Sequence, residues 1–263
     1  MSRFYLTLPS NSSMDYYPEN TVAQYMTKLN SVIELDGEWE IGLTEISIPS
    51  HVHNVIEGQC YYDLYIAGVH IRRINVTPGH YRRMRDLVED LHRSQRAQVP
   101  LQSHEPLLVE FSFDTGNKRV RMTCEDSLHQ HMHVEFNANL ARLLGYHFDV
   151  RYSLSHQKPK VSKFPPNLTG NIHSVYVYCD LGEHVLVGDI KAPLLRIVDR
   201  TSDARNVVHR TFNPPLYIPL QKKCFDTVEI NLMTDTGIPV PFLSGKSFVV
   251  MEFRLAAYKY FAM

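Results

Sequence analysis

The sequence predicts an all-β protein, a single jelly-roll β-sandwich of about ten strands with two short covering helices. Short runs of alternating apolar and polar residues recur along most of the chain, and clusters of turn-forming residues separate them. The 15 tyrosines and 12 phenylalanines supply aromatic residues that favour half-buried strands. Strands do not alternate regularly with long helices, so a parallel α/β sheet is not expected.

The N-terminal half of the chain is predicted to contain three hairpins after two separate extended runs. The extended runs are residues 4–8 and 22–29, and the hairpins pair 31–35 with 38–48, 61–66 with 70–76, and 107–113 with 120–124. Asp36-Gly37 and Ala67-Gly68 have the composition of two-residue hairpin turns. In the strand from residue 38, Trp39, Ile41 and Leu43 share one face, and Glu45 is a further candidate for it. We expect Trp39 to be buried between sheets.

Strands continue to dominate the C-terminal half, and only two segments have a helical pattern. The strands are predicted at 174–179, 193–198, 207–212, 227–233 and 247–255. One helix should span 78–92, with Thr77 as its N-cap and an apolar face formed by Met84, Leu87, Val88 and Leu91. The other should span 138–144 and end at Gly145. Both helices are expected to cover an open end of the sandwich.

The chain is expected to form one domain over residues 1–263, because no low-complexity linker or internal repeat divides it. Within that domain we expect an N-terminal arm at 1–20 and an elaborated central region at 77–169. Residues 153–169, which include three prolines and three lysines, are predicted to form a long exposed loop.

Charge and cysteine usage limit the function classes. The formal net charge is −1, so no overall basic field favours nucleic-acid binding, and no specific nucleic acid is expected as a partner. Cys60, Cys124, Cys179 and Cys224 form no CxxC pair, and we interpret all four as free buried thiols of a protein made in a reducing cytoplasm. No signal peptide or membrane-spanning segment is recognised. The glycosylation sequons at Asn11, Asn75 and Asn167 are attributed to chance.

The feature most typical of an enzyme is a row of histidines. His129, His131 and His133 alternate, so a strand would project their rings from one face, and Glu135 follows two residues later. A metal site of a cupin-like jelly-roll enzyme is one interpretation. The other is a solvated or interfacial face, which we favour because 14 histidines make local clusters expected. We therefore assign no catalytic residue, metal or cofactor.

Other polar groups have simpler interpretations. The carboxylates of Glu38 and Glu40 flank Trp39 in alternation and are expected on the wet side of a strand. Arg82, Arg83 and Arg85 are expected on the polar side of the first helix, where neighbouring acidic residues dilute their charge. Gly182, Gly188 and Gly237 lack phosphate-binding spacing and are interpreted as turn glycines.

A four-residue motif leaves two interpretations open. Pro214, Pro215 and Tyr217 have the Pro-Pro-x-Tyr spacing that WW domains bind, which would make a host WW-domain protein a partner. Because Tyr217 also begins the apolar run 217–220, packing within the fold is the alternative.

Several long segments together resemble a known family. They are FYLTLPSNSS at 4–13, LDGEWEIGLTEI at 35–46, GNIHSVYVYCD at 170–180, PLLRIV at 193–198, and FDTVEI at 225–230 with 242–254. In order and composition they are similar to the minor capsid (penton) protein of Polinton/Maverick elements and adintoviruses, with residues 77–166 the weakest part.

The resemblance implies a non-enzymatic structural protein of the virion, synthesised in the host cytoplasm. Its jelly roll would form homopentamers at icosahedral capsid vertices, among trimers of a double-jelly-roll major capsid protein. Two other classes stay open beside it: the cupin-like metal-dependent enzyme and a monomeric ligand-binding β-sandwich.

Overall fold

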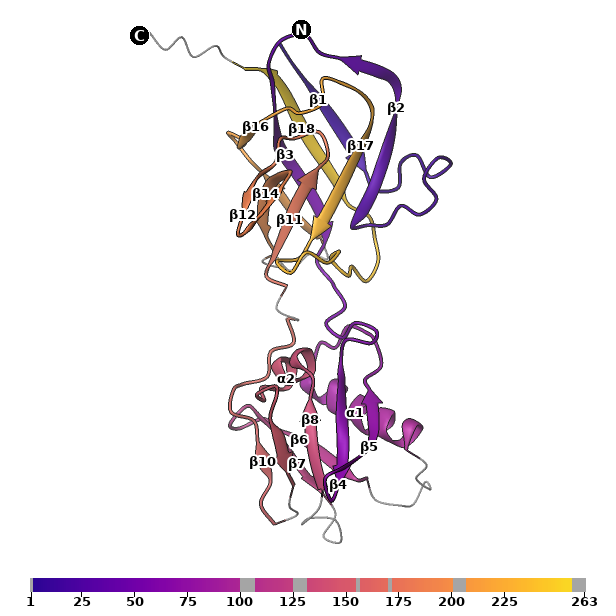
Figure 1. Ribbon diagram of the computed structural model, residues 1–263, viewed down its shortest axis with the longest axis vertical. Coiled ribbons are helices and arrows are strands. Elements are labelled where there is room, and N and C mark those ends of the chain that lie inside the picture. The colour runs from indigo at the N-terminus through magenta and orange to yellow at the C-terminus, as the bar shows by residue number, and fades with distance from the viewer. Residues whose placement is uncertain are drawn as a thin grey trace, which may run out of the picture. The chain divides into compact units, whose positions relative to one another are not determined.

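The structure is a computed structural model that describes residues 2–99, 107–124, 132–154, 157–169, 172–200 and 207–256 (Figure 1). The chain divides into two compact units, Met1–Val52 with Ile172–Met263 and His53–Asn171, which we call the sandwich unit and the inserted unit. Each unit encloses its own cluster of buried apolar side chains. One domain with an elaborated region at 77–169 was expected, and the structure differs because the middle of the chain, from His53 onward, packs on a separate core.

The sandwich unit consists of two antiparallel sheets and a small hairpin. The first sheet contains β1 (Arg3–Pro9), β18 (Phe248–Leu255), β3 (Trp39–Pro49), β15 (Val207–Thr211) and β16 (Tyr217–Pro219), and the last two both pair with β3. The second sheet has the order β14 (Leu194–Asp199), β11 (Ser174–Cys179), β17 (Cys224–Met233), β2 (Gln24–Glu34). The hairpin is β12 (Val185–Val187) with β13 (Ile190–Ala192).

The strand order identifies the sandwich unit as a jelly roll. If the main strands are lettered B to I in chain order, with β15 and β16 sharing the position G, the sheets read B-I-D-G and C-H-E-F. This is the two-sheet arrangement of a jelly roll. The inserted unit lies in the connection between strands D and E. Strand β1 begins and β18 ends at one end of the sandwich, because Arg3 pairs with Arg254.

The predicted hairpin around Asp36-Gly37 is wrong. Strand β2 continues to Glu34 and pairs with β17, whereas β3 pairs with β18, so the turn carries the chain from one sheet to the other. Gly37 has a φ of +89°, which glycine adopts without the strain that a side chain would add.

Strand β3 is central in its sheet, and a bulge at Thr44 alters its alternation. Trp39, Ile41 and Leu43 are buried as expected, and Trp39 is only 6% exposed. The register shifts after Leu43, and Ile46 rather than Glu45 then enters the core. The side chain of Thr44 donates a hydrogen bond to the Val250 carbonyl at 2.9 Å, which ties the bulge to β18.

The inserted unit contains two sheets and both helices. One sheet has the order β5 (Val69–Asn75), β4 (Tyr61–Ile66), β8 (Met132–Phe136), β9 (Arg151–Ser153), and the other β10 (Lys160–Val161), β7 (Arg119–Cys124), β6 (Val109–Asp114). The helices are α1 (Met84–Gln98) and α2 (Ala138–Leu144). Their apolar residues belong to the core of this unit and not, as was expected of helices that cover the sandwich, to the core of the sandwich.

Helix α1 starts six residues later than predicted. The apolar face of Met84, Leu87, Val88 and Leu91 is buried as expected, but the N-cap is Arg83. Asn54 holds the preceding segment extended, because its side chain accepts from the Tyr81 N–H at 2.9 Å and donates to the Tyr81 carbonyl at 2.9 Å. Arg82 and Arg83 therefore precede the helix rather than lie on its polar side. Helix α2 has the predicted bounds, with Gly145 in the left-handed region.

Several short strands were not predicted, namely β8, β9, β10, β12, β13 and β16. Two of them, β9 and β10, flank or lie within the segment that was expected to be one long loop at 153–169. The cysteines also differ from expectation in one case. All four are free, and Cys60, Cys124 and Cys179 are buried, but Cys224 is exposed at the start of β17, opposite Glu34 of the edge strand β2.

Candidate interaction surfaces

The outer side of the β5-β4-β8-β9 sheet carries a connected group of polar and aromatic side chains, which we call the polar face. Alternation along each strand sends Tyr62, Leu64 and Val134 into the core of the inserted unit and leaves their neighbours on the other side. The register then aligns Arg73, Asp63, Glu135 and Arg151 in a row across all four strands.

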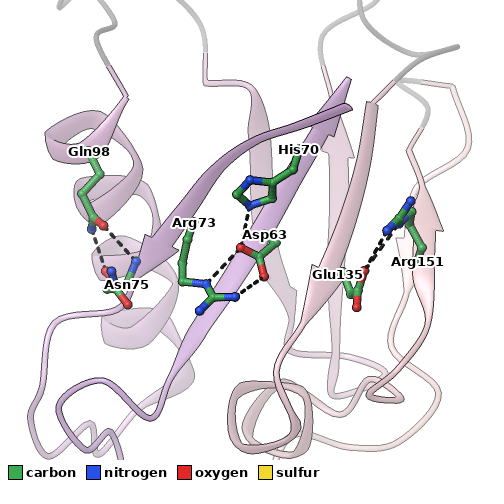
Figure 2. Close-up of polar contacts among 7 residues, drawn as sticks. All are labelled: Asp63, His70, Arg73, Asn75, Gln98, Glu135 and Arg151. Atoms are coloured by element: carbon green, nitrogen blue, oxygen red, sulfur yellow. Dashed lines mark hydrogen bonds and ion pairs between the residues drawn. The ribbon is translucent and has the colours of Figure 1, made fainter. Parts of the chain in front are cut away.

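Asp63 is the centre of the polar face (Figure 2). Arg73 donates from Nε and Nη2 to its two carboxylate oxygens at 3.1 and 3.0 Å, and His70 Nε2 lies 2.9 Å from Oδ1. The Asp63 side chain is 11% exposed, whereas those of Arg73 and His70 are about half exposed and cover it. Burial raises the pKa of Asp63, but the hydrogen bonds from Arg73 and His70 outweigh it, so the pKa is lowered overall.

Both arginines of the row also stack on tyrosines. The guanidinium carbon of Arg73 lies 3.8 Å from the centre of the Tyr61 ring, and that of Arg151 lies 3.8 Å from the Tyr65 ring. Arg151 Nη2 is 3.3 Å from Glu135 Oε2, and Figure 2 draws this ion pair. Each carboxylate is thus held by a guanidinium that rests on an aromatic ring.

A second contact fixes the edge of this sheet to α1. Gln98 donates from its side chain to the Asn75 carbonyl at 2.7 Å, and its Oε1 accepts from the Asn75 N–H at 2.9 Å (Figure 2). The side chain of Gln98 thereby occupies the backbone N–H and carbonyl of Asn75 at the end of the edge strand β5.

The sequence did not reveal the polar face, because a bulge decides its register. The Ala67-Gly68 turn pairs Tyr65 with His70, and a regular hairpin would then place Asp63 opposite Arg72. The shift between Leu64 and Tyr65 brings Arg73 opposite Asp63 instead. Asp63 in 61–65, and His70, Arg72 and Arg73 in 69–75, indicated a polar surface, but they did not specify which arginine pairs with Asp63.

Of the three histidines in the row, the structure describes only His133. His133 lies on β8 beside Tyr65 of β4, and Glu135 binds Arg151. His129 and His131 lie outside the described residues. Within the described ranges no three His, Cys, Asp or Glu side chains gather as metal ligands would.

The second candidate surface is an apolar groove on the sandwich unit, which we call the flank groove. It has a volume of about 730 Å³ and opens at the side where β14 and β16 end their sheets. Its lining includes Val185, Leu194, Ile197, Pro215 and Leu216. Leu216 is 59% exposed and Ile197 46%, so both present apolar surface to solvent.

The Pro-Pro-x-Tyr motif forms one wall of this groove. Pro214 and Pro215 line it, whereas the Tyr217 side chain lies on the sheet, where its hydroxyl donates to Glu252 Oε2 at 2.9 Å. The guanidinium carbon of Arg254 lies 3.4 Å from the centre of the Tyr217 ring. These contacts favour packing of Tyr217 within the fold, because a WW domain would need the ring to leave them. Binding of a WW-domain protein to Pro214, Pro215 and Tyr217 stays a prediction.

The remaining polar groups lie where strand geometry places them. Glu38 Oε1 is 2.7 Å from Lys223 Nζ, and Glu40 Oε2 is 2.7 Å from Arg254 Nη2, both on the outside of the sheet. No helix within the described residues has the length and apolar character needed to cross a lipid bilayer.

These features define the chain as an all-β protein with one jelly roll and a second domain inserted between strands D and E. No protein-family model and no curated protein matches the sequence. Among solved structures, the chain is similar to the mavirus penton protein, with 11% identity and a TM-score of 0.49 over 97% of this chain and 100% of that one. It is also similar to a chain of the Sputnik virophage, with 9% identity and a TM-score of 0.49 over 97% and 98%.

Proposed function

We propose that the chain is a minor capsid (penton) protein that forms homopentamers at the vertices of a Polinton/Maverick-like or adinto-like capsid. The observation that carries this proposal is the jelly roll with strand orders B-I-D-G and C-H-E-F, an architecture used in viral capsids. Most of the segments that resemble the penton family lie on its strands β1, β3, β11, β14, β17 and β18. A double-jelly-roll major capsid protein is the proposed partner, and the virion the proposed location.

The two flanks of the sandwich suit closure into a ring. One flank consists of the edge strands β1 and β2, with Tyr5 and Val32 more than half exposed. The other consists of β14, β15 and β16, with Val207 46% exposed. A contact between two different flanks repeats from copy to copy and closes as a ring when the rotation between copies fits.

The cupin-like alternative is disfavoured by where its ligands would lie. A cupin binds its metal inside the jelly roll, but residues 129–135 belong to the inserted unit. The interior of the sandwich is instead filled by apolar side chains such as Leu43, Val177, Ile230 and Met251.

Light scattering of the purified protein tests the proposal. We expect a mass of five copies without DNA, metal or major capsid protein. A protein that stays monomeric at high concentration, also on co-expression with the major capsid protein, would refute it. A trimer would refute it as well.

Flank variants make this test sharper. Val32→Asp and Val207→Asp each damage one flank, so each protein alone should lose the pentamer. Their equimolar mixture should form dimers, because each supplies the flank that the other has lost. Val69→Asp, on β5 of the inserted unit and 63% exposed, is the matched control and should keep the pentamer. Absence of dimers in the mixture would contradict a contact between two different flanks.

A further inference from the structure

The flank groove has apolar side chains that stay partly exposed to solvent in the described structure. Leu216 and Ile197 are 59% and 46% exposed on opposite sides of it, and the apolar residues Leu194, Pro215 and Ile218 complete its walls. Its charged lining residue, Arg196, rests with its guanidinium carbon 4.0 Å from the centre of the Phe212 ring. Such a site accepts an apolar or aromatic segment, and contact with it removes side-chain surface from water.

The C-terminus supplies a segment of matching chemistry. Residues 257–263, which lie outside the described structure, read Ala-Tyr-Lys-Tyr-Phe-Ala-Met. Three of the seven side chains are aromatic, and Lys259 carries the charge. In an extended conformation Tyr258 and Tyr260 would point to the same side, because side chains alternate along a strand.

This segment begins close enough to reach the groove. Leu255 pairs with Trp39, and the Ala256 N–H donates to the Glu38 carbonyl at 2.8 Å. Strand β16 pairs with β3 at Gly42, on the other side of β3 from β18. Two strand spacings and three residues along β3 correspond to about 14 Å. Seven extended residues span up to about 23 Å.

We propose that the C-terminal tail, residues 257–263, docks in the flank groove of its own chain. The short connection to β18 gives the tail a high effective concentration at the groove, so modest apolar contacts suffice to hold it there. Docking covers Leu216 and Ile197 and makes the tail part of that flank. This inference concerns one chain and holds whether or not five copies form a ring.

Trypsin cleavage after Lys259 tests the docking, with release of the peptide 260–263 measured by mass spectrometry. Cleavage follows the fraction of time that the tail is undocked. The test is made in the Val32→Asp background, which cannot close the ring but keeps this flank intact. There Leu216→Asp should speed the release by about tenfold or more, because a carboxylate in the groove weakens apolar docking. Val69→Asp is the matched control, since Val69 is equally exposed but lies in the inserted unit, and it should leave the rate unchanged.

A second measurement uses a synthetic peptide of residues 257–263. It should bind to the chain that ends at Ala256 and not to that chain carrying Leu216→Asp, while the full chain should bind it at least about tenfold more weakly. Equal cleavage rates in the parent and Leu216→Asp proteins would overturn the proposal. So would protection that disappears on dilution, because the tail would then dock on a second copy.

Discussion

Trp39 lies in the core of the sandwich at the start of its central strand β3. Its ring lies 5.7 Å from that of Phe4, and its Nε1 donates to the Asp36 carbonyl at 2.9 Å. We expect Trp39→Ala to lower the free energy of unfolding of the sandwich unit by about 3–5 kcal/mol, because it leaves a large cavity in the core. Chemical denaturation followed by circular dichroism measures this, with Tyr16→Ala, at a position that is 70% exposed and outside the flank strands, as control. A red-shifted, easily quenched emission from the native protein's Trp39 would contradict the burial.

Asp63 should make the stability of the inserted unit depend on pH. The pKa of Asp63 is lowered in the folded protein, so the unfolded chain, in which the pKa is about 3.9, takes up the proton first as the pH falls. The stabilisation is present above the unfolded pKa and is lost as the pH falls through the folded pKa. Asp63→Asn should therefore destabilise at pH 7, and its difference from the parent should shrink toward pH 3. Glu57→Gln, at an exposed position, is the control, and a constant difference would contradict the prediction.

At the scale of elements, the sequence predicted correctly the hairpin that is decided by its own turn residues, and it was wrong where distant residues decide the pairing. The Ala67-Gly68 hairpin formed as expected because both residues adopt positive φ, at 49° and 83°, as a two-residue hairpin turn requires. The Asp36-Gly37 hairpin failed because β17 and β18, which lie about 190 residues or more further along the chain, outcompete the local pairing. The predicted start of α1 was wrong for a similar reason, because the side chain of the distant Asn54 binds the backbone of Tyr81.

Gly145 provides a test of element geometry in the inserted unit. It ends α2 with a φ of +82°, and a Cβ built there would lie 2.1 Å from the Phe164 carbonyl oxygen. Gly145→Ala should thus destabilise the unit by clearly more than backbone strain alone. Gly58→Ala, at a φ of +68° with nothing within 4 Å, isolates the strain and should cost about 1–2 kcal/mol. Equal losses in thermal or denaturant unfolding would show that the segment at Phe164 moves away freely.

The whole molecule combines a fold that the sequence predicts with surfaces that it does not. All-β structure and the jelly roll follow from alternating segments that are spread along the chain. The polar face depends on the bulge in β5, and the flank groove on Leu194–Ile197 lying opposite 214–218, so neither could be found without the paired sheets. The second domain was missed because its strands alternate like those of the sandwich, and because no linker composition marks His53 or Asn171.

Because each unit has its own core, we expect the sandwich unit to assemble without the inserted unit. We expect residues 53–171 to fold alone with one cooperative transition and to stay monomeric, because a compact unit with its own core folds independently. The complementary chain, with Val52 joined to Ile172 by a glycine-serine linker, should keep both flanks and still form pentamers. Light scattering of both proteins measures their sizes. The sandwich chain carries Cys224→Ser, so that the exposed thiol cannot cross-link copies. High salt should weaken the assembly only mildly, because Arg3, Glu34 and Asp199 are the few acidic or basic residues, histidine aside, that are exposed on the described flank strands, and the net charge is −1. If residues 53–171 form the pentamer and the sandwich alone does not, ring closure belongs to the inserted unit and the flank contacts are wrong.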